Sequence, residues 1–366
     1  MYVAVPGRRD FKIRFSRGEF TGALGDSVTV LPVVVAVAAL TDLSLPRLLV
    51  GFAAFQVVWG LHYGLPVSVE PMKALAALVI AGGLGSDELA VAGLLAGATL
   101  LLIGVTDTLA RVETYIGRPV VRGVQLAVGL VLLETGVQLS LDGPAYALAA
   151  LAVAGVSVAI GRRRVSALLV LGLGVGIAVA TVGLPSPTVP TFGVALPTAT
   201  GLTANTAGAT AAQLAMTVGN AAIATSLLLT DYYDADVSAD DLATSMGVMN
   251  LVAAPFGAIP MCHGSGGVAG KYAFGARTAG SNLLLAGVFA VAAVVGVGIV
   301  AAFPMPVLGV LLGVVAVELC RTGLDTTDLP VAVGVGVLGL MTNIGVAFLV
   351  GIAAHRLRLY VGGADR

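Results

Sequence analysis

Charged residues are scarce in this chain. Asp, Glu, Lys and Arg make up 11% of its 366 residues, whereas soluble domains carry roughly 25%. Hydrophobic residues make up 58%, and the mean hydropathy is +1.01. The composition therefore excludes an ordinary soluble globular protein and predicts an all-α polytopic membrane protein.

Cysteine, histidine and aromatic residues are also few. The two cysteines, Cys262 and Cys320, lie in apolar segments, and the three histidines lie far apart in the sequence. These spacings fit neither a disulfide framework nor a metal-ligand cluster. We therefore expect no metal and no cofactor. The net charge is −1 and no basic tract stands out, which argues against a nucleic-acid partner.

Long apolar runs make up most of the chain. A helix that crosses a bilayer needs about 20 residues. We expect fourteen transmembrane segments, of which the third (66–82) and the tenth (260–277) are broken. The twelve continuous spans are expected near residues 20–40, 46–62, 88–107, 119–139, 145–160, 165–183, 205–229, 240–257, 281–302, 305–320, 327–341 and 343–360.

The basic residues orient these spans. Cytoplasmic loops carry an excess of Lys and Arg, and with fourteen spans nearly all basic residues outside the spans fall on one side, whereas Arg47 falls on the other. We therefore expect a multi-pass protein of the cell (plasma) membrane with both termini in the cytoplasm. The residues on the basic side are Arg8, Arg9, Lys12, Arg14, Arg17, Arg111, Arg118, Arg162, Arg163, Arg164, Arg277, Arg321, Arg356, Arg358 and Arg366.

Two proline- and glycine-rich stretches interrupt the apolar pattern. One is Gly64-Leu-Pro-Val-Ser-Val-Glu-Pro-Met-Lys-Ala-Leu-Ala-Ala77, and the other is Ala258-Ile-Pro-Met-Cys-His-Gly-Ser-Gly-Gly-Val-Ala-Gly-Lys271. Each reads as an extended piece, a polar break and the start of a short helix. Irregular backbone at membrane depth is tolerated where it lines a protein-enclosed cavity. A matched pair of such segments indicates a transporter's binding site.

The chain also shows an internal repeat. A shift of 194 residues superimposes Glu19 on Gln213, Gly25-Asp26 on Gly219-Asn220, Gln56 on Asn250 and Pro66 on Pro260. Seven spans per repeat is an odd number, so the second copy is expected to be inverted in the membrane. A 7+7 inverted repeat with broken helices is typical of secondary transporters.

An inverted repeat brings two half-helix N-termini face to face. We expect these helices to begin near Glu70–Pro71 and Gly264–Ser265. Free backbone N–H groups and helix dipoles at such ends favour an anion, and the glycines would let it approach closely. The candidate substrate-binding residues are Ser68, Glu70, Pro71, Met72, Lys73, His263, Gly264, Ser265, Gly266, Gly267, Gln56, Gln213 and Asn220.

Four intramembrane charges bear on this site, and such charges usually pair. Lys73 either neutralises Asp26 or contacts the substrate, and Lys271 is expected to extend toward the cytoplasm with Arg277. A carboxylate repels a bound anion unless it is protonated. Asp26 and Glu70 are therefore candidates for a coupled proton, and the alternative for Asp26 is a structural pair with Lys73 or with half-helix N–H groups.

At these motifs the sequence resembles a known family. The stretch from Pro66 to Ala77 looks like its P-x-x-x-Q-P-M-K motif, and the stretch from Phe256 to Arg277 looks like its second signature. Gly25-Asp26 and Pro119-Val-Val-Arg-Gly-Val-Gln125 are also similar. The family is the molybdate transporters of the sulfate-permease superfamily. Glu70 departs from it, because the family usually has glutamine there.

The resemblance implies a core domain (18–107 and 205–302) and a gate domain (119–183 and 305–360). It also implies oxyanion uptake by movement of the core, as in an elevator, and a homodimer. We therefore predict a secondary transporter of molybdate, with sulfate or tungstate next, and not an enzyme. The alternatives are a proton-coupled carrier of another anion or a nucleobase, a membrane-embedded enzyme with Cys262 and His263 at its centre, and an ion channel.

Overall fold

The computed structural model describes residues 13–191, 193–194 and 196–364 and is almost wholly helical. Arg8, Arg9, Lys12 and Arg366, which contributed to the predicted orientation, lie outside the described residues. The first half of the chain forms α1 (Arg17–Leu40), α2 (Leu45–Tyr63), β1 (Glu70–Pro71), α3 (Lys73–Ile80), α4 (Ser86–Val105), α5 (Leu109–Ile116), α6 (Arg118–Leu141), α7 (Pro144–Ala159) and α8 (Ser166–Val182).

The second half follows a similar order of elements. Its first two helices, α9 and α10, are joined into one continuous helix by a π-helical segment, Thr217–Ile223. The elements are α9 (Ala204–Met216), α10 (Ala224–Tyr233), α11 (Ala239–Ala253), β2 (Met261–Cys262), α12 (Ser265–Ala273), α13 (Gly280–Ala301), α14 (Met305–Leu324), α15 (Leu329–Met341) and α16 (Ile344–Ala364).

The helices are those of a membrane protein. Within the described ranges, nine are long and apolar enough to cross a membrane, judged by length and composition. The shorter apolar helices α7 and α15 fall on two further predicted spans. The sequence analysis missed α5, because its eight residues carry too little apolar length for a span.

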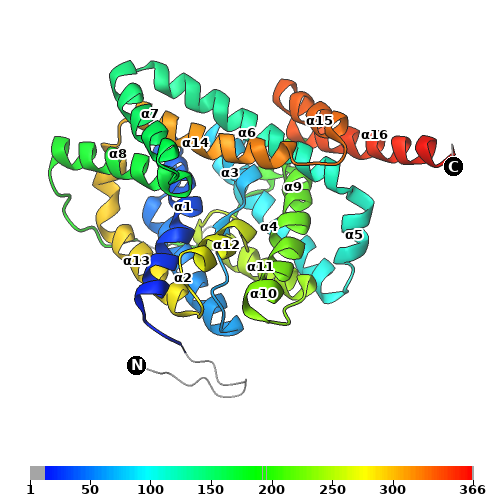
Figure 1. Cartoon of the computed structure of the whole chain (residues 1–366), viewed down its shortest axis with the longest axis horizontal. Coiled ribbons are helices and arrows are strands. Elements are labelled where there is room, and N and C mark those ends of the chain that lie inside the picture. The colour runs from blue at the N-terminus through cyan, green and yellow to red at the C-terminus, as the bar shows by residue number, and fades with distance from the viewer. Residues whose placement is uncertain (1–12, 192, 195, 365–366) are drawn as a thin grey trace.

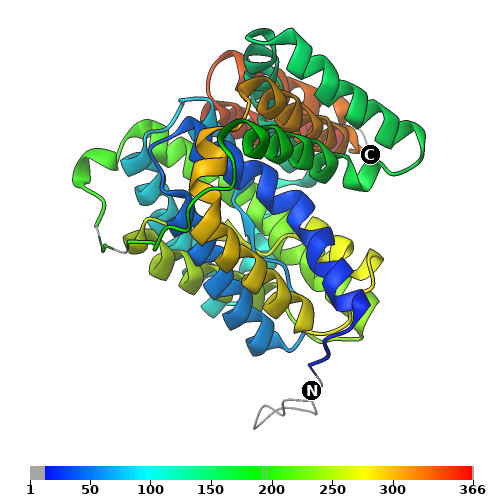
Figure 2. The same cartoon turned by 90° about the vertical axis from the view of Figure 1, so that its left-hand side faces the viewer.

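The helices lie in two groups (Figures 1 and 2). One group, which we call the upper layer, contains α6, α7, α8, α14, α15 and α16. The remaining helices except α5 form the lower layer, where α4 packs on α11 and α2 packs on α13. Glycines bring these pairs close: a Cβ on Gly97 of α4 would lie 3.0 Å from the Cβ of Asn250 on α11. Small residues commonly allow such close approach between helices in membranes.

The two interrupted stretches meet inside the lower layer. β1 and β2 pair antiparallel, with Glu70 opposite Cys262 and Pro71 opposite Met261. The short helices α3 and α12 leave this ribbon. The expected start of α12 agrees with the structure, but α3 begins at Lys73 rather than near Glu70–Pro71. The cause is the pairing with β2, which keeps Glu70 and Pro71 extended.

Candidate functional site

A cavity of about 1670 Å³ reaches the N-terminal ends of α3 and α12. The upper layer supplies residues of α6, α7, α8 and α14 to its wall, and the lower layer supplies α1, α3, α9 and α12. At the half-helix ends it is lined by Lys73, Gln213, Asn220, Gly264, Ser265 and Gly266. It also extends to the basic loop Arg162–Arg164, between α7 and α8.

The N-terminus of α12 offers two amide groups to this cavity. Gly264 is the N-cap residue, and the N–H of Gly267 donates to Oε1 of Glu70 at 2.7 Å. The N–H groups of Ser265 and Gly266 have no hydrogen-bond partner within the described part of the chain. The first turn of a helix leaves such groups unsatisfied unless a side chain, water or ligand caps them.

The three glycines of this turn differ in what surrounds them. A Cβ on Gly264 would overlap the carboxylate of Glu70, and a Cβ on Gly267 would overlap Asp26 and Ser68. No atom lies within 4 Å of a Cβ built on Gly266. The missing side chains at Gly264 and Gly267 thus give room to Glu70, Asp26 and Ser68, whereas at Gly266 the space in front of the backbone is open.

The N-terminus of α3 is capped by a neutral amide. Oε1 of Gln213 accepts the N–H groups of Ala74 and Leu75 at 2.9 and 3.3 Å, and its Nε2 donates to Thr217 at 2.9 Å. Because the cap carries no net charge, the positive end of the α3 dipole is not neutralised by it. Gln213 thus holds the half-helix and also lines the cavity.

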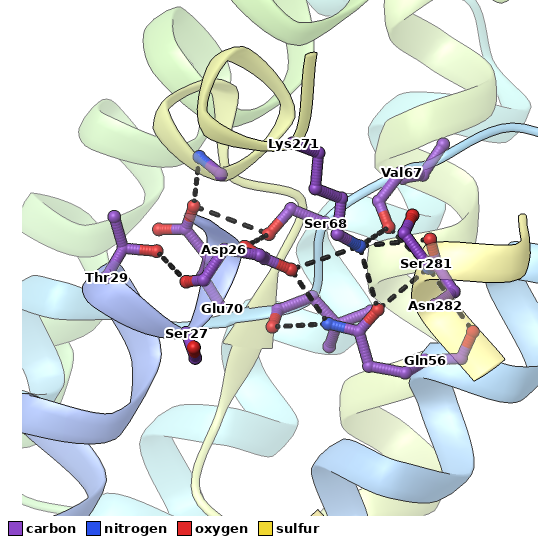
Figure 3. Close-up of polar contacts among 12 residues, drawn as sticks. Asp26, Ser27, Thr29, Gln56, Val67, Ser68, Glu70, Lys271, Ser281 and Asn282 are labelled. Atoms are coloured by element: carbon purple, nitrogen blue, oxygen red, sulfur yellow. Dashed lines mark hydrogen bonds and ion pairs between the residues drawn. The ribbon is translucent and has the colours of Figure 1, made fainter. Parts of the chain in front are cut away.

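Lys73 and Glu70 form an ion pair at the cavity wall. Nζ of Lys73 contacts Oε2 of Glu70, and the exposed fractions of the two side chains are 23% and 0%. The hydroxyl of Thr29, next to this pair, donates to the backbone carbonyl of Asp26 at 2.9 Å (Figure 3). Lys73 therefore neutralises Glu70 rather than Asp26, and it is the member of the pair that reaches the cavity.

Asp26 pairs with Lys271 instead. Nζ of Lys271 lies 3.0 Å from Oδ2 of Asp26, and both side chains are fully buried. The expectation that Lys271 extends toward the cytoplasm is wrong. α12 crosses α1 at Gly25 and Gly270, where a Cβ on Gly25 would lie 3.0 Å from the carbonyl oxygen of Gly270. This crossing turns Lys271 toward α1 and α2.

Several other candidates lie behind the cavity wall. His263 contacts Oγ of Ser245 at 2.7 Å and the carbonyl of Ser68 at 3.0 Å, and Oγ of Ser68 donates to Asp26 at 2.5 Å. Gln56 donates to Asp26 at 3.1 Å. These side chains are buried, as are Pro71 and Met72. They support the half-helices and do not line the cavity.

Three polar residues of this region were missed from the sequence. Asn282 hydrogen-bonds Gln56 and Val67, and Thr29 and Thr217 line the cavity. Gln56 was identified as a polar side chain inside an apolar span, and Asn282, at the start of the predicted span 281–302, offered a similar signal. Thr217 stands in the π-helical segment with Asn220, whose Nδ2 is buried without a hydrogen-bond partner in the described structure. Such π-helical turns occur frequently at functional sites.

Comparison with known proteins adds to this geometry. A family model described as "Molybdate transporter of MFS superfamily" matches residues 18–132 and 205–319. Molybdate transporter 2 of Arabidopsis thaliana is 32% identical over 84% of this chain and 79% of its own length. Molybdate transporter 1 of the same plant is 35% identical over 85% of this chain and 81% of its own length.

Solved structures share the fold at low sequence identity. The transmembrane domain of the cyanobacterial bicarbonate transporter BicA is 18% identical, with a TM-score of 0.62 over 92% of this chain and 96% of that one. The murine anion transporter Slc26a9, inward-facing, is 13% identical, with a TM-score of 0.68 over 94% of this chain and 68% of that one. The fold is therefore of the SLC26 type, and the chain belongs to the family described as the molybdate transporters of the MFS superfamily.

Proposed function

We propose that this protein is a secondary transporter that takes up a tetrahedral oxyanion, molybdate first and sulfate or tungstate next. The observation that carries the proposal is the meeting of one cavity with two helix N-termini and an ammonium group. The free N–H groups of Ser265 and Gly266 and the charge of Lys73 converge there. Helix N-termini bind phosphate, sulfate and similar anions in many proteins.

The fourteen-segment inverted repeat remains part of this proposal, and the order of elements supports it. α1 and α9 begin 187 residues apart, at Arg17 and Ala204, and α6 and α14 also begin 187 residues apart. The broken segments β1–α3 and β2–α12 occupy the same place in each series. The family model matches two stretches with the same 187-residue offset. A single shift of 194 residues does not fit every pair of elements, which is expected when loops differ in length.

The lower layer is proposed as the core domain and the upper layer as the gate domain. The cavity between them extends to Arg162–Arg164, on the side expected to be cytoplasmic, so we propose an inward-open state. At the other side, Asn343 of the gate donates to Asn205 of the core at 2.7 Å. Gly208 and Gly345 touch beside this bond. Movement of the core against the gate would break these contacts and open the cavity outward.

Glu70 is the proposed site of proton coupling. Its carboxylate holds the N-terminus of α12 and binds Lys73, so it competes with a substrate anion for both. Protonation would release Lys73 and remove the repulsion. The other charged or titratable groups that face this region are Asp26, Lys271, Cys262 and His263. Plasma-membrane location, cytoplasmic termini and a homodimer are further proposals from the sequence.

A nucleobase carrier fits this cavity less well. Such a carrier needs an aromatic ring with an open face near the half-helices. Tyr272 stacks on Tyr232 with centroids 4.1 Å apart, and the guanidinium of Arg277 lies 3.9 Å from the same ring centroid. Because two groups cannot lie this close over one face, both faces of Tyr272 are covered, and this ring offers no stacking surface to a nucleobase.

Uptake of labelled molybdate into vesicles that contain only the purified protein tests the proposal. We expect saturable uptake that unlabelled tungstate and sulfate compete with, and that an inward proton gradient accelerates. The comparison variant is Gly266→Leu, whose Cβ meets no atom within 4 Å and whose side chain would stand in front of the free amides; it should reduce uptake. If the vesicles take up none of molybdate, tungstate and sulfate, with or without the proton gradient, the proposal is refuted.

A further inference from the structure

Four oxygen atoms surround the ammonium of Lys271 (Figure 3). Oδ2 of Asp26 lies 3.0 Å from Nζ, and Oε1 of Gln56 lies 3.1 Å away. The carbonyl oxygen of Val67 and Oδ1 of Asn282 each lie 3.0 Å away. The four groups come from α1, α2, the extended segment before β1, and α13, so the fold itself assembles this cage.

The cage has more acceptors than a lysine has protons. An ammonium carries three N–H donors, yet four oxygens lie at nearly equal distances from it. If directional hydrogen bonds alone held the ammonium, three acceptor oxygens would be enough. A shell of equidistant oxygens is the arrangement that a spherical cation takes.

The amide groups are held with their oxygens facing inward. Nε2 of Gln56 donates to Asp26 and to the carbonyl of Val69, at 3.1 and 3.4 Å. Nδ2 of Asn282 donates to Val67 at 2.6 Å and to Oε1 of Gln56 at 2.7 Å. These bonds fix both amides without the help of Lys271, so the oxygen shell is organised for a positive charge independently of the lysine.

Charge and size define the cation that would fit. One carboxylate and three neutral oxygens match a single positive charge. The distances of 3.0 to 3.1 Å exceed the 2.3–2.6 Å of calcium sites and the 2.0–2.1 Å of magnesium sites. The cage therefore suits a monovalent cation of about the size of ammonium.

We propose that this cage is a monovalent-cation site that the protein fills with its own side chain. Lys271 acts as a tethered cation, and the transporter needs no free metal ion at this place. Truncating Lys271 exposes the site, which then binds free ammonium or potassium. The binding of a cation by this cage does not depend on which substrate the protein carries. The statement that the transporter needs no free metal ion here does rest on the proposed transport function.

Thermal unfolding of Lys271→Ala and Lys271→Met, without any oxyanion, tests the inference. The purified variants are heated in chloride salts of ammonium, potassium or choline at equal ionic strength. A ligand that binds the folded state raises its stability with concentration. We expect the melting temperature of both variants to rise with ammonium or potassium relative to choline, and that of the unaltered protein to stay the same.

Two further variants sharpen the test. Lys73→Ala removes an intramembrane lysine whose one ion-pair partner in the described structure is Glu70, and it should gain no dependence on cations. Adding Asp26→Asn to Lys271→Ala removes the negative charge of the cage and should abolish the rise. A rise in Lys73→Ala as large as that in Lys271→Ala would contradict the assignment of the cage.

The absence of any cation-dependent rise in folded Lys271 variants would overturn the inference. If both variants misfold in choline, they are produced and purified in ammonium. Recovery of folded protein there supports the inference, and misfolding in ammonium as well overturns it. Failure of oxyanion uptake would refute the proposed function and leave these melting results standing, so the two failures are distinguishable.

Discussion

The amide N–H of Gly267 donates to the carboxylate of Glu70 at 2.7 Å, across the junction of the two interrupted segments. An anionic group of the protein thereby caps a helix N-terminus that borders the cavity. The neighbouring amides of Ser265 and Gly266 remain open. The carboxylate of Glu70 thus occupies one of the N–H groups at this helix end. Its negative charge repels a substrate anion that approaches the two open N–H groups.

Replacing Glu70 with glutamine should strengthen oxyanion binding near neutral pH. The amide keeps an acceptor for Gly267 but carries no charge, so it no longer repels the substrate or neutralises Lys73. One unit charge at such short range is worth at least the 1.4 kcal/mol that changes affinity about tenfold. Calorimetric titration with molybdate measures this change.

The same variant tests the pH dependence. In the unaltered protein, protonation of Glu70 removes the repelling charge, so affinity should rise as the pH falls. In Glu70→Gln the affinity should change little with pH. Glu134→Gln, at an exposed position of α6, is the matched control and should keep the dependence. A pH dependence that survives in Glu70→Gln would assign the proton to another group.

Alanine substitutions at Gly264 and Gly266 should separate stability from binding. A Cβ at Gly264 overlaps Glu70, so this variant should lower the melting temperature. A Cβ at Gly266 meets no atom within 4 Å, so Gly266→Ala should melt normally and bind molybdate more weakly. Equal melting temperatures for the two variants would show that Glu70 does not lie where this account requires it.

Gln213→Leu should destabilise the protein by about 1–3 kcal/mol for each amide that loses its partner. The side chain of Gln213 accepts the N–H groups of Ala74 and Leu75, and leucine cannot replace that oxygen. Gln213→Glu keeps the acceptor and serves as the comparison. It should fold well and bind oxyanions more weakly, because it adds negative charge at the cavity. Chemical denaturation and titration measure the two effects.

Gly345→Ala should shift the conformational equilibrium. A Cβ there would lie 2.6 Å from the backbone carbonyl carbon of Gly208, and backbone atoms cannot move aside as a side chain can. The contact between the two layers would therefore loosen on the side away from Arg162–Arg164. A cysteine introduced by Asn205→Cys should react faster with a thiol reagent added from the external side when Gly345→Ala is also present than when it is absent. Unchanged labelling would contradict the proposed closing contact.

The membrane class, most helix positions and the two interrupted segments could be predicted from the sequence, because hydropathy and helix-breaking residues act locally. The internal repeat drew attention to Gln213, and the second interrupted stretch drew attention to Ser265 and Gly266; all three line the cavity.

The partners of the buried charges could not be predicted. The sequence analysis did not pair Lys73 with Glu70 or Lys271 with Asp26, because these pairs depend on how α12 crosses α1 and on the pairing of β1 with β2. Both are contacts between residues about 190 to 250 positions apart. The start of α3 differed from expectation for the same reason, since the bridge to Met261 and Cys262 holds Glu70 and Pro71 extended.

Calorimetric binding of molybdate and of sulfate to the purified protein, at about pH 6 and about pH 8, tests the central claim most directly. The account predicts saturable binding of molybdate at both pH values, weakened in Gly266→Ala. It predicts weaker binding of sulfate at the same site, visible as competition. No binding of either anion at either pH would contradict an oxyanion site between α3 and α12.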